Sequence, residues 1–396
     1  MGTTFREATV RFPVDAVTTE DLVERVEALL PAISERALQV ERDRQIASET
    51  VAAIKAARLN RVMQPIAWGG FGLDIEVFFE ISWRLASACG STGWVYSVAA
   101  MQNWEMGVQP HAVQADFYAK PDVLSCSAFN PRGASVAPAE DGWMLSGRWQ
   151  YASGCLHADW AKLGVMISGT ATMGLMLVPR DDFEIEDTWH VSGLRGTGSH
   201  DIVITEPIFV PGHRFMPSNV ERGDKAVVLG SYGAPLQSIG PWGVVTPVIG
   251  MAQGALNAYE NYTRDRLTAF SGKPVSNMAG AQMRIAEAGA QIDAARALAR
   301  STIREIIDRG NASEPFSDEF RVRIRRDQAY IVNLCYDATM LICRAAGAGS
   351  LFETNPIQRF MRDVHAASMQ IVSNWDEQAE SYGRVRMGLE PNSQTW

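Results

Sequence analysis

The sequence predicts an α+β protein in which a helical N-terminal domain, a central β-barrel or β-sandwich domain and a C-terminal four-helix bundle follow one another. Apolar residues recur at helical spacing up to about residue 120, form short β-rich runs in the middle of the chain, and return to helical spacing after Pro241. A chain of 396 residues exceeds one typical core. We therefore expect three domains, at residues 1–120, 121–230 and 231–396.

The N-terminal domain begins with an amphipathic helix for which residues 18–21 supply a capping signal. The segments 75–89 and 91–108 are apolar on most sides, which predicts central helices. Pro110 and Pro121 bracket a short last helix and mark the end of the domain.

The middle of the chain changes to short β-rich runs separated by Gly, Pro and Asp. They include residues 163–167, 174–178 and 201–210. Helical spacing then returns over four long spans, which predicts a bundle. These spans are residues 244–264, 278–309, 318–346 and 356–382.

The composition favours small-molecule partners. The net charge is -9 and the basic residues are scattered, which argues against nucleic acid or an anionic membrane as the main partner. The five cysteines contain no Cys-x-x-Cys pair, and no apolar leader opens the chain, so we expect a cytoplasmic protein. No apolar run approaches the roughly 20 residues that span a bilayer. The six histidines are scattered, and we expect no metal site.

The stretch 142–160 is expected to form a β-hairpin that carries Ser153. Trp143, Trp149 and Tyr151 share one parity of a strand, so all three could face one side and sandwich a flat ring system. Alternatively, the stretch is an ordinary edge of a β-core with no role in binding a ring system.

Several motifs of other enzyme classes are absent, among them Gly-x-Gly-x-x-Gly after a strand, the P-loop, His-Glu-x-x-His and Gly-x-Ser-x-Gly. The glycines of residues 193–199 have the wrong spacing for a dinucleotide fold, and a β-turn explains them. Ser153, His157 and Asp159 are close in sequence, but a turn after a strand would not assemble them into a catalytic triad.

Two arginines, Arg264 and Arg266, lie at the end of a long predicted helix. Cations at this position complement the helix dipole, which is a structural role, and they could equally hold a phosphate.

Taken together, these features resemble the acyl-CoA dehydrogenase fold over nearly the whole chain. The motifs that carry the resemblance are residues 266–274, Gln282, residues 347–349 and the Arg362-Asp363 pair. The stretches 147–160 and 195–201 are more specific. They resemble the flavin-dependent monooxygenases of this fold, such as the oxygenase components of p-hydroxyphenylacetate hydroxylase, secosteroid hydroxylase and dibenzothiophene monooxygenase.

The resemblance implies an oxygenase component that binds reduced FMN or FAD delivered by a separate flavin reductase. O2 would react through a C4a-hydroperoxide and hydroxylate an aromatic or heteroaromatic substrate, indole-like or phenolic. Dehydrogenases of this fold commonly take a catalytic Glu from a turn shortly after the Arg-Asp pair, whereas no carboxylate follows Arg362-Asp363 at that spacing. Without a base to remove an α-proton, acyl desaturation loses its first step.

The resemblance also implies roles for single residues. Ser153 would hydrogen-bond flavin N5 and prolong the life of the hydroperoxide in a dry pocket. Arg266, or alternatively Arg264, would hold the flavin phosphate across a subunit interface of a homotetramer. The remaining cofactor-binding candidates are Tyr151, Ser127 and Gln370.

Two glutamines depart from the pattern. Gln102 and Gln370, which with Ser153 are the catalytic candidates, stand where relatives often have histidine. Glutamine cannot exchange a proton near neutral pH, so neither can be the general base for a phenol. Either the substrate needs no deprotonation, or another group acts, with His365 and His157 as candidates. Alternatively, the hydroperoxide acts as a nucleophile or collapses to hydrogen peroxide.

The expected substrate pocket contains Trp104, Tyr96, Phe129 and Gln102. Aromatic residues in central helices are more often plain core, which is the alternative. Two rival functions stay open at this point: an acyl-CoA dehydrogenase or oxidase with a relocated base, and a catalytically silent flavin-binding protein.

Overall fold

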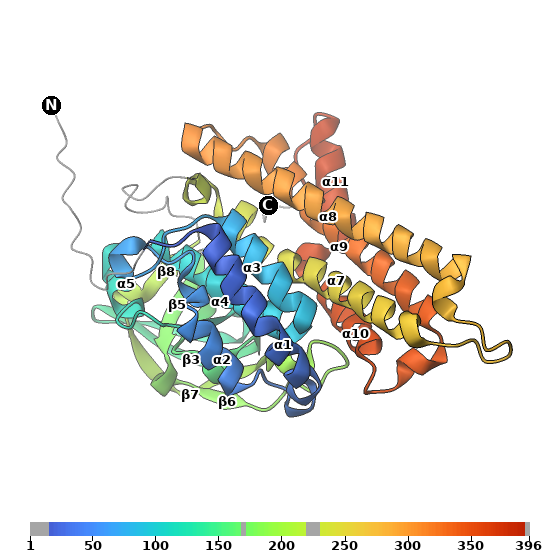
Figure 1. Ribbon diagram of the computed structural model, residues 1–396. Coiled ribbons are helices and arrows are strands. Elements are labelled where there is room, and N and C mark those ends of the chain that lie inside the picture. Colours follow the sequence, from blue (N-terminus) through green and yellow to red (C-terminus); the bar gives the residue numbers. More distant parts are fainter. Residues whose placement is uncertain (1–15, 168–171, 219–229, 393–396) are drawn as a thin grey trace.

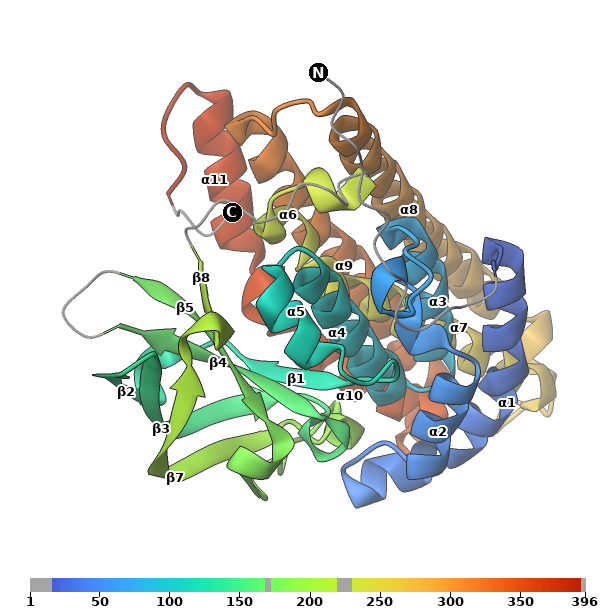
Figure 2. The same ribbon diagram turned by 90° about the vertical axis from the view of Figure 1, so that its left-hand side faces the viewer.

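The computed structural model describes residues 16–167, 172–218 and 230–392 (Figure 1). Two groups of helices share one hydrophobic core, and a β-sandwich with a core of its own lies against one side of them (Figure 2). The predicted α+β fold class with its helical, β and helical parts is confirmed. The boundaries at 120 and 230 stay predictions.

The N-terminal helices form as expected. The side-chain oxygen of Thr18 accepts from the Asp21 N–H at 3.1 Å, and the Asp21 carboxylate accepts from the Thr18 N–H at 2.9 Å, so a capping box begins the first helix. Nearly every residue of the fourth helix is buried, which confirms its central place. The helices are α1 (Thr19–Asp43), α2 (Ser48–Ala56), α3 (Ile75–Ala88), α4 (Gly90–Gly107) and α5 (His111–Phe117).

The β-domain consists of two four-stranded sheets with a common core between them. The strand orders are β1-β4-β5-β8 and β2-β3-β7-β6; β1 and β4 are parallel, and the other pairs are antiparallel. The strands are β1 (Ser125–Ala128), β2 (Ala134–Ala139), β3 (Gly142–Ala152), β4 (Trp160–Met166), β5 (Met173–Pro179), β6 (Glu184–Glu186), β7 (His200–Pro211) and β8 (Phe215–Pro217).

The predicted hairpin over residues 142–160 is wrong, because β3 and β4 belong to different sheets. β3 pairs with β2 and β7, and the turn after it crosses to the other sheet. The three-ring wall is also wrong, because the pairing of β3 with β7 shifts register between Trp149 and Ala152, which breaks the side-chain alternation before Tyr151. Trp149 is buried in the sandwich core and Trp143 packs partly against it, whereas Tyr151 has a φ of 69° and is 66% exposed.

The C-terminal helices pack as a bundle of α7 to α10, and α7 also packs on α3. The expected single helix over 356–382 is wrong. The side-chain oxygen of Gln370 accepts from the Val372 N–H at 2.6 Å and caps a 3-10 turn, Ile371–Ser373, that divides the span in two. The helices are α6 (Leu236–Ile239), α7 (Trp242–Asp265), α8 (Ala279–Ala312), α9 (Asp318–Ala346), α10 (Pro356–Ser368) and α11 (Trp375–Arg386). Within the described residues, no helix is both long and apolar enough to cross a bilayer.

Candidate active site

Ser153 lies in the tight turn that ends β3, half-buried where the sandwich meets α4. Its backbone N–H donates to the carbonyl of Tyr151 at 3.0 Å. Its hydroxyl accepts from the indole N–H of Trp94 on α4 at 3.3 Å and lies 2.7 Å from the Ser199 hydroxyl. The turn therefore places the Ser153 hydroxyl two residues after Tyr151, whose exposed ring lies edge-on to Trp189 with ring centroids 6.0 Å apart.

The hydroxyl of Ser153 is the outer member of a buried polar chain. The Ser199 hydroxyl lies 2.7 Å from that of Thr197, which in turn donates to the carbonyl of Leu194 at 2.8 Å. Residues 195–201 belong to the stretch that carries the resemblance. The series of hydroxyl contacts could not be predicted from the sequence, because it depends on contacts between β3 and the segment before β7.

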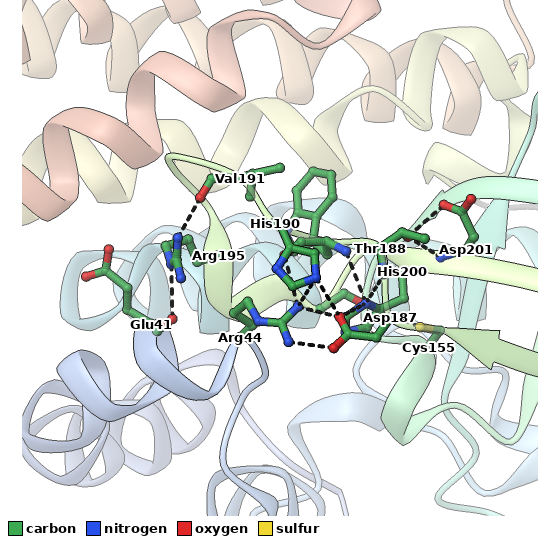
Figure 3. Close-up of polar contacts among 12 residues, drawn as sticks. Glu41, Arg44, Cys155, Asp187, Thr188, His190, Val191, Arg195, His200 and Asp201 are labelled. Carbon is green, nitrogen blue, oxygen red and sulfur yellow. Dashed lines mark hydrogen bonds and ion pairs between the residues drawn. The ribbon is translucent and has the colours of Figure 1, made fainter.

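The segment between β6 and β7 that supplies Ser199 is held against α1 and β7 by polar contacts (Figure 3). Arg44, the residue after α1, forms an ion pair with Asp187, and this guanidinium lowers the pKa of Asp187 to about 2. Thr188 donates to the carboxylate of Asp201 at 2.9 Å. The segment is therefore a fixed part of the fold near the site.

The Arg362-Asp363 pair of α10 holds the other side of the same segment. The Leu194 N–H donates to the Asp363 carboxylate at 2.6 Å, and Arg362 donates to the carbonyl of Ser192 at 2.6 Å. A Cβ on Gly193 would lie 1.9 Å from the Arg362 carbonyl oxygen, so only glycine allows this close approach. Residues 195–197 form a 3-10 turn, which agrees with the expectation of a turn rather than a dinucleotide loop.

The substitution Asp363→Asn is expected to change how stability depends on pH. Burial raises the pKa of Asp363 from 3.8 to about 6. Between about pH 4 and pH 6 the folded state therefore binds more protons than the unfolded state, and this group lowers the free energy of unfolding by about 3 kcal/mol as the pH rises through that range. Asparagine keeps the acceptor for the Leu194 N–H and removes the titration.

Urea unfolding of wild type and Asp363→Asn at about pH 4.5 and pH 7.5 measures the effect. The variant should gain stability relative to wild type at the higher pH, and a pH-independent difference would contradict the assignment. As a control, Asp363→Ala leaves the Leu194 N–H unpaired and should cost about 1–3 kcal/mol.

Gln102 and Ser127 are brought together, a contact that was not predicted from the sequence. Gln102 is buried on α4 and donates to the Ser127 hydroxyl at 3.0 Å, while its carbonyl oxygen accepts from Ser125 at 2.7 Å. Both serines lie on β1. The amide therefore bridges α4 and the sandwich with both ends of its side chain occupied.

One buried ion pair at this junction was not anticipated. Lys162 of β4 is 0% exposed and pairs with Glu105, one turn after Gln102 on α4. Lys162 is also the register partner of Ser127. Burial lowers the pKa of Lys162. A signal was available in the sequence, because Glu105 is the only charged residue of α4 and Lys162 the only charged residue of β4.

The aromatic residues predicted to line a substrate pocket separate in the structure. Tyr96 lines a small cavity of about 30 Å³ between α2, α4, β1 and the turn after β3, together with Ser125, Gly154 and His157. Trp104 is 0% exposed, and its indole N–H donates to Ser231 at 3.1 Å in the helical core. Phe129 follows β1 and is 60% exposed.

The candidate histidines do not contact Ser153. His157 bonds the carbonyl of Ile46 at 3.0 Å, and burial lowers the pKa of its ring. The Asp159 carboxylate accepts from the Leu124 N–H at 3.0 Å. The side chains of Ser153, His157 and Asp159 thus each bond a different partner. His365 is exposed beside Tyr336, with ring centroids 5.9 Å apart.

The predicted phosphate ligands lie far from Ser153 within one chain. Arg266 follows α7 and donates to the carbonyl of Ala346, at the end of α9, at 2.6 Å, while Arg264 is exposed. The connection from α7 to α8 lies at the end of the bundle away from the sandwich (Figures 1 and 2). Gln370 caps its 3-10 turn and lines a surface hollow with Asn333 and Tyr336.

Comparisons with known proteins identify the family. Residues 242–375 match the family model described as acyl-CoA dehydrogenase, C-terminal domain. The flavin-dependent monooxygenase oxygenase subunit HsaA of Mycobacterium tuberculosis is 34% identical over 392 residues, which cover 94% of this chain and 96% of HsaA. The chain belongs to the flavin-dependent monooxygenases.

Two further relatives are similar to this flavin-dependent monooxygenase over nearly its whole length. The oxygenase component of an FADH2-dependent resorcinol hydroxylase from a Rhizobium species is 32% identical, with 94% of this chain and 95% of the relative covered. XiaF from a Streptomyces species, solved in complex with FADH2 and glycerol, has a TM-score of 0.88 and 27% identity, with 96% of this chain and 98% of XiaF covered. The predicted acyl-CoA dehydrogenase-like fold and the oxygenase branch are confirmed.

The residues around Ser153 fit a flavin ring. A half-buried hydroxyl, that of Ser153, follows by two residues an aromatic side chain, Tyr151, that is 66% exposed. A planar ring placed against Tyr151 would cover this apolar surface and meet a hydrogen-bonding group at its edge. At the end of β3 this flavin-dependent monooxygenase therefore has a hydroxyl and an exposed aromatic ring that suit a flavin.

Proposed function

We propose that this chain is the oxygenase component of a two-component monooxygenase, which takes reduced FMN or FAD from a separate flavin reductase and hydroxylates a small aromatic substrate. The observation that carries the proposal is the Ser153 hydroxyl, held between Trp94 and Ser199 in the turn that follows the exposed Tyr151. When bound, the reduced flavin supplies the two electrons with which one oxygen atom of O2 becomes water while the other enters the substrate.

The protein contributes positioning and exclusion of water. Ser153 would bind the N5 edge of the flavin, Tyr151 would cover a ring face, and Ser127 and Gln370 would lie nearby. Gln102 has both ends of its amide occupied by serines, so it fixes the β1 wall and moves no proton. Gln102 and Ser127 are buried where α4 meets β1, which limits access of water on that side of the site.

A homotetramer would explain the place of Arg266. Within one chain Arg266 belongs to the connection from α7 to α8, which lies at the end of the bundle away from the sandwich (Figure 1). Its contact with Ala346 uses one of five N–H donors, so further donors stay available for a phosphate. We propose that Arg266, or the exposed Arg264, reaches the flavin phosphate of a neighbouring subunit.

The small cavity beside Gly154 supports a neutral aromatic substrate near Tyr96. Its described lining contains no lysine or arginine that could pair with a carboxylate, and burial lowers the pKa of His157. A volume of about 30 Å³ holds little more than a water molecule, so side chains must move to admit an aromatic ring. Trp104 and Phe129 would then lie outside the substrate pocket and not contact the substrate directly. The five unpaired cysteines suit a reducing cytoplasm.

Turnover with a chosen set of aromatics tests the proposal. The purified chain is mixed with an NADH-dependent flavin reductase, FMN or FAD, catalase, and resorcinol, phenol or indole, and products are identified by mass spectrometry. We expect a hydroxylated product that requires both proteins, and slower reaction of p-hydroxyphenylacetate and indole-3-acetate. Bleaching of bound oxidised flavin by an acyl thioester, with no hydroxylation, would indicate a dehydrogenase. Failure of every reaction would indicate a catalytically silent protein.

A further inference from the structure

Ser153, Ser199 and Thr197 form a chain of hydroxyl groups, and counting their protons shows which hydroxyl donates in each hydrogen bond. The Thr197 hydroxyl has one proton and donates it to the carbonyl of Leu194 at 2.8 Å, because a carbonyl oxygen can only accept. The contact of 2.7 Å between Thr197 and Ser199 must then be donated by Ser199.

The same count shows whether the Ser153 hydroxyl can donate or accept a further hydrogen bond. Ser199 has given its only proton to Thr197, so the contact of 2.7 Å between Ser153 and Ser199 must be donated by Ser153. The indole N–H of Trp94 occupies one lone pair of the Ser153 oxygen at 3.3 Å. Ser153 is left with one free lone pair and no free proton.

Burial maintains this order. Thr197 is 2% exposed and Ser199 is 3% exposed, so water does not compete for their hydroxyls. The segment that carries them is fixed at Leu194 by Asp363 and at Asp187 by Arg44 (Figure 3). Reversing the proton of Ser153 would leave a buried acceptor or donor unpaired, which is unfavourable.

We propose that Ser199 and Thr197 are positioning residues that make Ser153 a hydrogen-bond acceptor toward flavin N5, so that the site selects the reduced cofactor. The inference rests on the proposed function. Reduced flavin carries a proton on N5 and donates there, whereas N5 of oxidised flavin has only a lone pair. An acceptor at Ser153 can therefore hydrogen-bond the N5 proton of reduced flavin, whereas it would face the N5 lone pair of oxidised flavin with no proton between them.

Flavin binding to the apoprotein tests this selection without turnover. Dissociation constants for oxidised flavin, and for reduced flavin under anaerobic conditions, are measured for wild type, Ser199→Ala and Thr197→Val. Ser199→Ala removes the acceptor of the Ser153 proton, whereas Thr197→Val releases the Ser199 proton so that Ser199 can donate to Ser153. In both variants the Ser153 proton becomes available to oxidised flavin. We expect the affinity for oxidised flavin to rise about fivefold, the worth of one neutral hydrogen bond, with little change for reduced flavin. Thr197→Ser keeps the hydroxyl and should bind like wild type.

The midpoint potential of the bound flavin gives a second readout. In wild type it should lie above that of free flavin, and in Ser199→Ala and Thr197→Val it should fall toward the free value, whereas a loss of packing alone would weaken both redox states together. A wild-type preference for reduced flavin that persists unchanged in both variants overturns this inference and leaves the proposed function standing. Absence of wild-type binding to either redox state overturns both.

Discussion

Replacing Ser153 with alanine is expected to separate oxygen consumption from product formation. The variant loses the hydroxyl that Trp94 and Ser199 hold and that we propose binds the flavin edge, so that reduced O2 would leave as hydrogen peroxide. We expect product formed per flavin oxidised to fall about tenfold or more, the effect of losing one oriented hydrogen bond in a water-poor site. Product and peroxide are both quantified for each variant.

Two variants control this experiment. Ser153→Thr keeps a hydroxyl and should retain much of the coupling. Ser135→Ala removes an exposed serine of β2 in the same domain and should behave as wild type. Wild-type coupling in Ser153→Ala would show that the hydroxyl is not part of the flavin site.

The ion pair between Glu105 and Lys162 should give the largest stability effect. Lys162→Met leaves the Glu105 carboxylate without its partner, and Glu105→Leu leaves a fully buried ammonium alone. Each single substitution should cost about 3–5 kcal/mol, because an unpaired buried charge is far less favourable than a paired one. A fall in Tm of roughly 4–6 °C is expected from calorimetry.

The double substitution Glu105→Leu with Lys162→Met distinguishes pairing from simple loss of packing. Apolar residues of similar size should restore most of the stability, because no charge is left buried. Additive losses in the double variant would show that the two side chains do not depend on each other.

Helical spacing allowed most of the fold to be predicted, since it is a local property of the chain. The span 318–346 agrees with α9 at both ends. The span 356–382 was wrong because a single side chain, Gln370, caps a turn inside it, and periodicity does not register such a bond.

The β-domain was less predictable because strand partners are chosen at long range. Nothing local shows that β3 and β4 enter different sheets, or that a register shift after Trp149 turns Tyr151 outward while Trp149 stays in the core.

The site was predicted in part. The motif that carries Ser153 could be quoted from the sequence, and Gln102 and Ser127 were both named, although their mutual contact was not. The partners Ser199 and Thr197 lie more than 40 residues further along, so only the tertiary structure brings them to Ser153.

The most direct measurement of the central claim is isotope transfer from molecular oxygen. The chain is loaded with reduced flavin without air and then exposed to 18O2 in the presence of resorcinol or another neutral aromatic, and the product mass is determined. An oxygenase component predicts one 18O atom in each hydroxylated product, with formation dependent on Ser153. Oxidation of the flavin with all of the 18O recovered as peroxide and water, for every aromatic supplied, would contradict the account.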